Sequence, residues 1–377
     1  MRIAIVTSGR FHVCDLAREL DARGHDVAFY SLVPPSRTAR FGLPARCNRW
    51  LGPHLVALHL LCRTLARSPL RPFAQHLLAG VVDRVAARVV EPCDVFIGMS
   101  GLCRASLESV TRRFGARTLL ERGNRHILSQ RAILEDCRGP RVPPWAVRRE
   151  LAGYDLAEKI VVPSKHAEAS FVERGVPAGK MFRNPYGVDL RMFPPTPTPP
   201  PDHPPTVIMV GGWSVRKGCD VLVESWRRMA TPGTRLLHVG RIVNAELPAD
   251  AGFEHRDHVD QGRLTELYAE AHVMALASRE EGLALVQAQA LASGLPLVAT
   301  DRTGAEDLQE YLADPAAIAI TPADDVNAFA QALDTQLTRA RRHHGSRDLL
   351  GAAREHLTWE AYGQRYDTML RQWVNAS

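Results

Sequence analysis

The chain of 377 residues is 45% apolar and 23% charged, with a net charge of +6, which predicts a globular protein of two domains of about 190 residues each. No apolar run approaches the roughly 20 residues of a membrane span, and the short apolar run at the start predicts a buried first strand rather than a signal peptide. Seven cysteines without a C-x-x-C pair argue against a zinc site and predict reduced thiols in the cytosol.

The two halves of the chain differ in charge. Up to Leu190, 29 Lys and Arg oppose 17 Asp and Glu, which gives a net charge of +12, and the remainder carries −6. A basic first half predicts contact with an anionic partner or surface. The positive charge alone would be compatible with a nucleic-acid partner. No recognition motif supports one, so we expect no nucleic-acid partner.

The first 32 residues have the pattern of a strand, a glycine loop, a helix and a second strand. The strands are predicted at Arg2–Thr7 and Val27–Leu32, and the helix at Val13–Arg23 has apolar residues spaced for one buried face. This unit is typical of a doubly wound parallel sheet. Gly9 lies in the loop that would approach a ligand, but the G-x-G-x-x-G fingerprint is absent, so a simple tight turn remains the alternative.

Residues 51–90 have a mostly helical pattern that prolines at 69 and 72 divide into two helices. Apolar residues share one face of the first helix and basic residues another: Leu58, Leu61, Cys62 and Leu65 against His59, Arg63 and Arg67. Such a helix can lie on an anionic membrane surface. The alternative, which we favour, is a surface helix whose apolar stripe packs on its own sheet.

Polar side chains follow the next two predicted strands, Asp94–Met99 and Arg117–Leu120. Glu121, Arg122 and His126 come directly after the second of them. Open α/β sheets bind their ligands at the carboxyl ends of parallel strands. These three residues are therefore candidate site residues, and the alternative is a turn in which His and Arg only form ion pairs with Glu121.

A proline-rich segment divides the chain. Before it come a helix at Trp145–Ala157, a strand at Lys159–Val162 and a helix at Lys165–Arg174. Residues 194–205 then contain eight prolines, and so stiff and extended a segment is an interdomain linker rather than core. The predicted division is residues 1–190, a linker at 191–205, a second domain at 206–356 and a final segment at 357–377.

The second domain opens with a candidate phosphate site. Gly211 and Gly212 follow the predicted strand Thr206–Val210, and Arg216 and Lys217 precede a helix that starts at Cys219. Free backbone amides together with positive side chains favour a phosphate group. The loop is no Walker A motif, because G-x-x-x-x-G-K-[ST] is not satisfied.

Two further strands are predicted at Arg235–Val239 and Glu254–Val259, and a helix at Leu264–Ala271. Arg241 follows the first strand, and the second ends at His258 and Val259. Residues at strand ends are candidate ligand contacts, and an ordinary connection between strand and helix is the alternative.

The most informative stretch runs from Ser278 to Thr300. After the strand Val273–Ala277, a polar turn with Glu280, Glu281 and Gly282 leads into a predicted helix at Leu283–Ala292. Gly294 supplies the left-handed residue that ends the helix, and a strand begins at Leu297.

The start of this helix is a candidate ligand site. We expect the backbone amides of Gly282, Leu283 and Ala284 to be free there, which favours an anionic or hydroxyl-rich ligand beside Glu281. Gln289 lies eight residues after Glu281, about two turns along a similar side of the helix.

These motifs resemble the donor-binding signature of retaining GT-B glycosyltransferases of the large family 4, or group 1, type. Glu281 matches the first acid of the signature, and A-L-A-S-G-L-P-L-V-A-T matches its tail, with Gln289 in place of the second Glu. The resemblance implies that Glu281 lies by the donor sugar, that residue 289 binds the ribose and that Lys217 contacts the pyrophosphate. Gly212 stands where the family has an Arg, and Arg216 is the candidate substitute.

The resemblance extends to the first half. A subset of the family has an acid-Arg-Gly segment followed by His, which matches Glu121, Arg122 and His126 and implies acceptor handling or leaving-group stabilisation. In the family, the backbone near the position of His258 and Val259 faces the nucleotide base.

The resemblance implies an α/β protein of GT-B fold, with two Rossmann-like doubly wound domains facing across a cleft and a last helix, Trp359–Trp373, that crosses back to the first domain. It implies retaining, metal-independent transfer of a hexosyl group from a UDP- or GDP-sugar co-substrate, with no bound cofactor. The acceptor would be a saccharide or a lipid-linked saccharide in surface polysaccharide or glycoconjugate synthesis, and the basic first half is the reason to expect an anionic or lipid-linked one. The protein would be cytoplasmic, with peripheral contact at the inner face of the membrane as a further option.

The sequence leaves two alternatives to a retaining glycosyltransferase open. One is a GT-B enzyme of another type, a sugar-nucleotide epimerase or a phosphorylase. The other is a binding protein without catalytic activity, which Gln289 and Gly212 suggest. The residues leave the donor sugar, base, acceptor, linkage and oligomeric state open.

Overall fold

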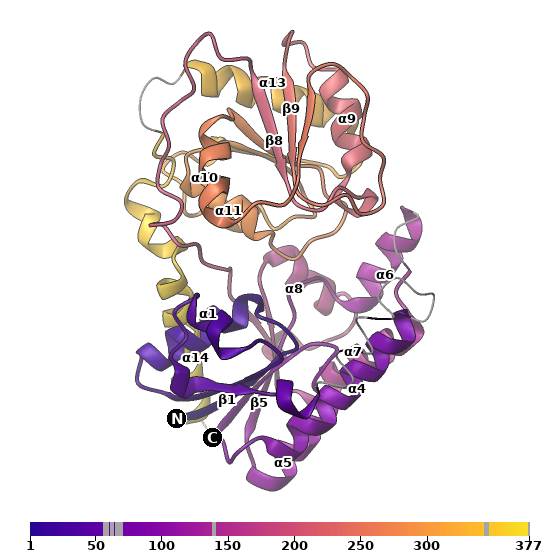
Figure 1. The fold of residues 1–377 in the computed structure, drawn as a ribbon, viewed down its shortest axis with the longest axis vertical. Helices are drawn as coiled ribbons and strands as arrows, with labels where there is room; N and C mark the ends of the chain where they lie inside the picture. The colour runs from indigo at the N-terminus through magenta and orange to yellow at the C-terminus, as the bar shows by residue number, and fades with distance from the viewer. Residues whose placement is uncertain (56–59, 61–63, 65–70, 138–140, 343–346, 376–377) are drawn as a thin grey trace.

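Each half of the chain folds around its own parallel sheet, and helices cover both faces of each sheet (Figure 1). The computed structural model describes residues 1–55, 60, 64, 71–137, 141–342 and 347–375. The apolar and basic residues of the amphipathic helix expected near residue 60 lie outside this part of the chain. No helix among the described residues is long and apolar enough to cross a membrane.

The N-terminal sheet has the strand order β3-β2-β1-β4-β5-β6-β7. Its strands are β1 (Arg2–Val6), β2 (Asp26–Ser31), β3 (Asn48–Trp50), β4 (Val95–Met99), β5 (Arg117–Glu121), β6 (Lys159–Val162) and β7 (Met181–Arg183). Its helices are α1 (Phe11–Ala22), α2 (Pro35–Ala39), α4 (Arg71–Val89), α5 (Arg104–Phe114), α6 (Ile127–Asp136), α7 (Pro144–Leu156) and α8 (Lys165–Val172). In β1, Ile3 and Ile5 pack with α1 while Ala4 and Val6 pack with α4 and α5, as expected for a sheet buried on both faces.

The C-terminal sheet has the order β10-β9-β8-β11-β12-β13, again with parallel neighbours. Its strands are β8 (Thr206–Val210), β9 (Arg235–Val239), β10 (Phe253–Arg256), β11 (Val273–Leu276), β12 (Leu297–Thr300) and β13 (Ile318–Thr321). Its helices are α9 (Cys219–Arg227), α10 (Gln261–Ala269), α11 (Leu285–Ala292), α12 (Glu306–Gln309) and α13 (Val326–Arg342). Ile208 packs with α10 and α11, and Met209 packs with α9 and α13.

Two segments join the domains. The proline-rich segment runs along the second domain, where the backbone N–H of Thr196 donates to the carbonyl O of Ser293 at 3.0 Å. The last helix, α14 (Trp359–Asn375), packs on α1 of the first domain. There His25 contacts the carboxylate of Asp367 at 2.7 Å between buried side chains. The chain therefore crosses between the domains twice (Figure 1).

Most of the expected elements form. The strands at 159–162, 206–210 and 235–239 have the predicted bounds, and the GT-B fold expected from the sequence is confirmed. Two boundaries near candidate site residues were wrong. Strand β10 ends at Arg256 and not at Val259, so His258 and Val259 lie in the loop after it. Helix α11 begins at Leu285, two residues later than predicted, because Ala284 has an extended backbone and forms its N-cap. The amides of Gly282, Leu283 and Ala284 thus belong to the loop before the helix and not to its first turn.

Gly294 ends α11 as expected. Its φ is +87°, and a Cβ there would lie 2.0 Å from the carbonyl O of Arg347, whose side chain is buried. Both the left-handed backbone and the close contact exclude a side chain at this position.

We predict that Gly294→Ala lowers the free energy of unfolding by about 3 kcal/mol, since a left-handed residue with a Cβ costs about 1–2 kcal/mol and overpacking adds a similar amount. Gly115→Ala is the matched control: its φ is +62°, but nothing lies within 4 Å of a Cβ there. Denaturant unfolding of both variants measures the difference. Equal losses in the two variants would show that the Arg347 contact has no energetic consequence.

Candidate active site between the two domains

Loops of the second domain meet at the carboxyl ends of β8, β11 and β12, the edge of an open parallel sheet where ligands bind. The loop after β8 contains a 3-10 turn, Val215–Lys217, whose N-terminus is capped by the hydroxyl of Ser214. Gly218 follows with φ +64°, and a Cβ there would lie 1.9 Å from the carbonyl O of Ala277. The close packing of these loops places Arg216 and Lys217 beside the loop that follows β11.

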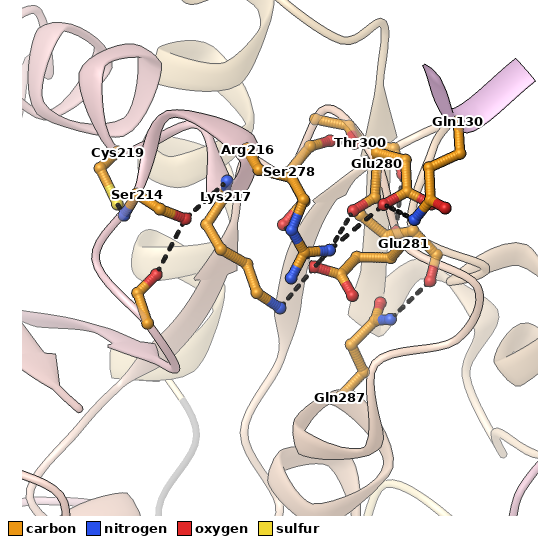
Figure 2. A network of polar contacts seen from close by, with 12 residues as sticks. Gln130, Ser214, Arg216, Lys217, Cys219, Ser278, Glu280, Glu281, Gln287 and Thr300 are labelled. Carbon is orange, nitrogen blue, oxygen red and sulfur yellow. Dashed lines mark hydrogen bonds and ion pairs between the residues drawn. The ribbon is translucent and has the colours of Figure 1, made fainter. Parts of the chain in front are cut away.

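Glu281 is the centre of the polar network in Figure 2. Its Oε1 forms an ion pair with the Lys217 ammonium, lies 3.2 Å from Nη1 of Arg216 and accepts a bond from the Ser278 hydroxyl at 3.4 Å. Burial alone would raise the pKa of Glu281, but Lys217 and Arg216 outweigh burial and lower this pKa. The carboxylate is therefore charged at neutral pH.

Glu280, the preceding residue, points toward the first domain. Its side chain is fully buried, and its Oε2 lies 3.3 Å from Nη1 of Arg216 and 3.1 Å from Nε2 of Gln130 on α6 (Figure 2). Burial and the adjacent charge of Glu281 raise the pKa of Glu280. The two neighbouring acids thus have pKa values shifted in opposite directions, a pattern common at functional sites.

Arg122 connects this network to the first domain. The buried guanidinium donates to Oε1 of Gln130 at 2.8 Å and pairs with Glu150 at 2.8 Å. A continuous polar chain therefore runs from Glu150 through Arg122 and Gln130 to Glu280. Arg122 makes its ion pair with Glu150 and not with Glu121, the partner that the sequence suggested as an alternative.

A second set of contacts holds the backbone of the Glu281 loop. The Ser164 hydroxyl donates to the carbonyl O of Gly282 at 2.7 Å, and Nε2 of His166 bonds the carbonyl O of Glu281 at 2.8 Å. A Cβ on Gly282 would lie 1.9 Å from the carbonyl O of Gly123. The first domain thus touches the candidate catalytic loop directly, and the described conformation is closed at this point.

Glu121 and His126 lie deeper in the first domain. Nε2 of His12 is 2.9 Å from Glu121, and both side chains are buried. His126 caps α6 by accepting a bond from the backbone N–H of Leu128, and burial lowers its pKa to about 4. Their expected roles in acceptor handling stay predictions, since no described contact joins either side chain to Glu280 or Glu281.

The glycines of the β8 loop make room for neighbouring groups. Gly211 has φ +139°, and a Cβ there would lie 3.7 Å from Cε of Lys217. A Cβ on Gly212 would meet the Val243 side chain at 2.9 Å, so the space beside Gly212 is occupied. Arg216, four residues further on, supplies the guanidinium that reaches Glu281.

Gln289 lies apart from the charged network and lines a cavity of about 880 Å³ between the domains. Gln261 and Leu285 line it from the same domain, and Arg10 and Phe41 line it from the other. The cavity therefore adjoins the loop that contains Gly9 and extends along the cleft from the α11 motif.

The remaining candidates are less closely placed. Arg241 and His258 are exposed, Val259 is partly buried, and among the described residues no side-chain contact joins any of them to the network. Their proximity to a nucleotide base stays a prediction. Within the described part of the chain, no group of three or more His, Cys, Asp or Glu side chains is placed to hold a metal ion.

Sequence reasoning missed Glu280, Gln130 and His166 as site residues. Glu280 adjoins the motif acid, and its position in the same turn was the available signal. Gln130 and His166 had none, because their importance comes from the packing of one domain on the other.

Residues 204–339 match the family model of the group 1 glycosyl transferases. A GDP-mannose-dependent alpha-mannosyltransferase of Mycobacterium tuberculosis is 31% identical over 173 residues, 44% of each chain, so the match spans less than half of that relative. A sucrose-phosphate synthase structure from Thermosynechococcus elongatus superposes with a TM-score of 0.68 at 20% identity over 100% of both chains. Anabaena HepE with UDP-glucose gives 0.66 at 14% identity, covering 99% of this chain and 100% of that one.

Together these similarities define a protein of GT-B fold whose second domain contains the polar network. Its second domain matches the group 1 glycosyl transferases over residues 204–339, and the similarity of the whole chain to solved structures lies in the fold.

We predict that Gly282→Ala holds the domains apart, because the added Cβ would overlap with the Gly123 carbonyl only when they are closed. Small-angle scattering should show a larger radius of gyration at nearly unchanged thermal stability. Gly179→Ala is the control, since nothing lies within 4 Å of a Cβ there. An unchanged radius in Gly282→Ala would contradict the contact.

Closure should also depend on pH. Burial lowers the pKa of His166 to about 4, while the bond to Glu281 opposes this and nearby Arg125 reinforces it. An exposed His166 would titrate near its ordinary value of about 6.5. Because the closed state disfavours the imidazolium, closure is complete above about pH 6.5 and weakens as the pH falls from there toward 4.

Scattering between pH 7.5 and 5 should therefore show opening in the wild type and a weaker pH dependence in His166→Gln, which keeps an N–H donor for the Glu281 carbonyl. The same pH dependence in both proteins would assign the opening to other groups.

Proposed function

We propose that this protein transfers a sugar, with retention of configuration, from a nucleotide-diphosphate sugar to a saccharide or lipid-linked acceptor. The observation that carries the proposal is the Lys217–Glu281–Arg216 cluster, which lies in the family-matched region at the carboxyl ends of the strands. Retention follows the resemblance of the Glu281 motif to retaining enzymes. The GDP-mannose and UDP-glucose named for the similar proteins support a nucleotide sugar as donor.

In the transfer, the bond between C1 of the sugar and the diphosphate oxygen breaks, and the electron pair leaves with the diphosphate. An acceptor hydroxyl oxygen bonds to C1, and its proton passes to the departing phosphate. Lys217 and Arg216 would stabilise the charge that develops on the diphosphate, which is electrostatic catalysis at the leaving group. No metal ion is needed for this step when two side-chain cations serve it.

Glu281 would orient the donor sugar. Its lowered pKa keeps it an acceptor for sugar hydroxyl groups, and its ion pairs with Lys217 and Arg216 fix the carboxylate between the sugar and the diphosphate. The bonds from Ser164 and His166 to the same loop would make this orientation depend on domain closure. Closure would also exclude water, which competes with the acceptor.

The cavity of about 880 Å³ that Gln289 lines would receive the nucleoside. Its volume falls within the range of small-molecule sites. Gln289 can donate to and accept from ribose hydroxyls as a neutral group. Arg10 and Phe41 of the other domain face the same cavity, so the nucleoside would contact both domains.

On the acceptor side, the polar chain Glu150–Arg122–Gln130–Glu280 would lie near the incoming hydroxyl group. The basic first half of the chain supports an anionic acceptor, as in surface polysaccharide or glycoconjugate synthesis, and the site would then face the cytoplasm or the inner surface of the membrane.

A thermal-shift series with UDP, GDP, ADP, dTDP and their sugars tests the proposal, because a saturating ligand stabilises the fold by mass action. We expect one base to be preferred, and Lys217→Ala to abolish the shift while Lys180→Ala retains it. With the preferred donor, Lys217→Ala should lower kcat about 10²- to 10³-fold.

No shift with any nucleotide would favour the binding protein without catalytic activity. Donor turnover without an acceptor would favour an epimerase, and dependence on inorganic phosphate would favour a phosphorylase.

A further inference from the structure

A second cavity, of about 470 Å³, lies in the first domain between α4, α5 and α7. In Figure 1 these three helices lie close together in the first domain, and α5 contacts both α4 and α7. Most of the residues that line the cavity are basic or aromatic, two are acidic (Asp83 and Glu108), and no part of the proposed donor site uses any of them. We name it the basic pocket, after its lining residues His76, Gly80, Arg84, Arg104, Trp145 and Arg148 together with Arg149.

The positive charge of the basic pocket is only partly neutralised. Arg149 pairs with Asp83 at 3.3 Å, and Arg104 pairs with Glu108 at 3.3 Å. Within the described part of the chain, Arg84 and Arg148 have no carboxylate partner and both are exposed. Two positive charges are therefore left to attract an anion.

Asp83 lines the pocket as well and offsets part of the charge of Arg149. Its two carboxylate oxygens accept bonds from the backbone N–H groups of Ala105 and Ser106 at 2.8 and 2.9 Å, at the start of α5. A carboxylate engaged in this way satisfies the helix terminus and Arg149. The helix terminus itself is thus occupied, and the attraction for a ligand comes from the arginines.

Two guanidinium groups converge at the floor of the pocket. Measured from the position that a Cβ on Gly80 would occupy, Nη1 of Arg149 is 3.5 Å away and Nη1 of Arg84 is 4.0 Å away. Both cations therefore approach the same point, and an anion bound there would reduce their mutual repulsion. Guanidinium forks match the geometry of phosphate oxygens, which favours a phosphate group over a single carboxylate.

An aromatic wall stands beside these cations. The rings of Trp145 and His76 lie 4.6 Å apart, and Nδ1 of His76 is buried without a described hydrogen-bond partner. An indole face beside a cationic site can pack against a sugar or an isoprenoid chain attached to the phosphate.

The basic pocket adjoins the acceptor side of the cleft. Arg149 is followed by Glu150, which bonds Arg122 of the interdomain network and the Ser100 hydroxyl after β4. The starts of α5 and α7 lie at the carboxyl edge of the N-terminal sheet, the edge that faces the second domain.

We propose that the basic pocket binds a phosphate group of the acceptor, so that the acceptor is a phosphate-linked saccharide. Only the identification of the ligand as an acceptor rests on the proposed transferase function. The binding of phosphate in the basic pocket rests on the contacts described above. Arg84 and Arg148, the two lining arginines without a carboxylate partner among the described residues, supply the charge that attracts the phosphate. Arg149 converges with Arg84 on the same point, and Trp145 packs against the group attached to the phosphate.

Calorimetric titration of the full chain with two probes tests the proposal: inorganic pyrophosphate and geranyl diphosphate. Both probes also carry phosphate for the donor site, so the titrations are run in the Lys217→Ala background. We expect binding to persist there and to weaken at least about tenfold in Arg84→Gln/Arg148→Gln, since two charge-assisted contacts are lost. Arg112→Gln, an exposed arginine near the other end of α5, is the matched control and should bind as before.

Trp145→Ala distinguishes the two sources of phosphate. A selective loss of geranyl diphosphate supports a lipid-linked phosphate, and an equal affinity for both probes supports a soluble one. Undiminished binding in Arg84→Gln/Arg148→Gln overturns the proposal, and so does an equal loss in Arg112→Gln or the absence of binding in the Lys217→Ala background. If the proposed donor site were wrong, the result would differ: nucleotides would not raise the melting temperature of the wild type, while phosphate would still bind in the basic pocket.

Discussion

The ion pairs of Glu281 with Lys217 and Arg216 are the interaction on which the proposed chemistry depends. A buried carboxylate without partners would lose its charge, and two adjacent, partly buried cations without a carboxylate would repel each other. Together they keep two partly buried cations and one buried carboxylate charged. Electrostatic interactions are strong in such surroundings, which is what stabilisation of a departing diphosphate requires.

The closed interface extends this arrangement across both domains. Gln130 reaches Glu280, and Ser164 and His166 bond the backbone of the same loop, so the second domain's acids are positioned partly by the first domain. Because residue 282 is a glycine, its backbone can lie against that of Gly123 in the first domain, where a Cβ would be only 1.9 Å from the Gly123 carbonyl O. The orientation of Glu281, the proposed donor-binding acid, is thereby coupled to closure, and the basic pocket lies at the far end of the same polar chain, beyond Glu150.

The sequence predicted the fold and most of the strands and helices around the candidate donor site, because these depend on local patterns. Buried strands in a doubly wound sheet are continuous apolar runs in the sequence. Gly294 and Pro296 likewise indicate the end of α11 from the sequence alone. The later start of α11 could not be foreseen, since Leu283 and Ala284 are good helix formers and tertiary contacts decide their conformation. Gln130 and His166 become site residues only through contacts between residues more than 100 positions apart.

A crystal structure of the full chain with the nucleoside diphosphate that stabilises it most would test the central claim most directly. We expect the two phosphates within hydrogen-bond distance of Lys217 and Arg216, the ribose beside Gln289 and the domains in contact at Gly282. A nucleotide bound elsewhere, with Lys217 still paired only with Glu281, would contradict the account.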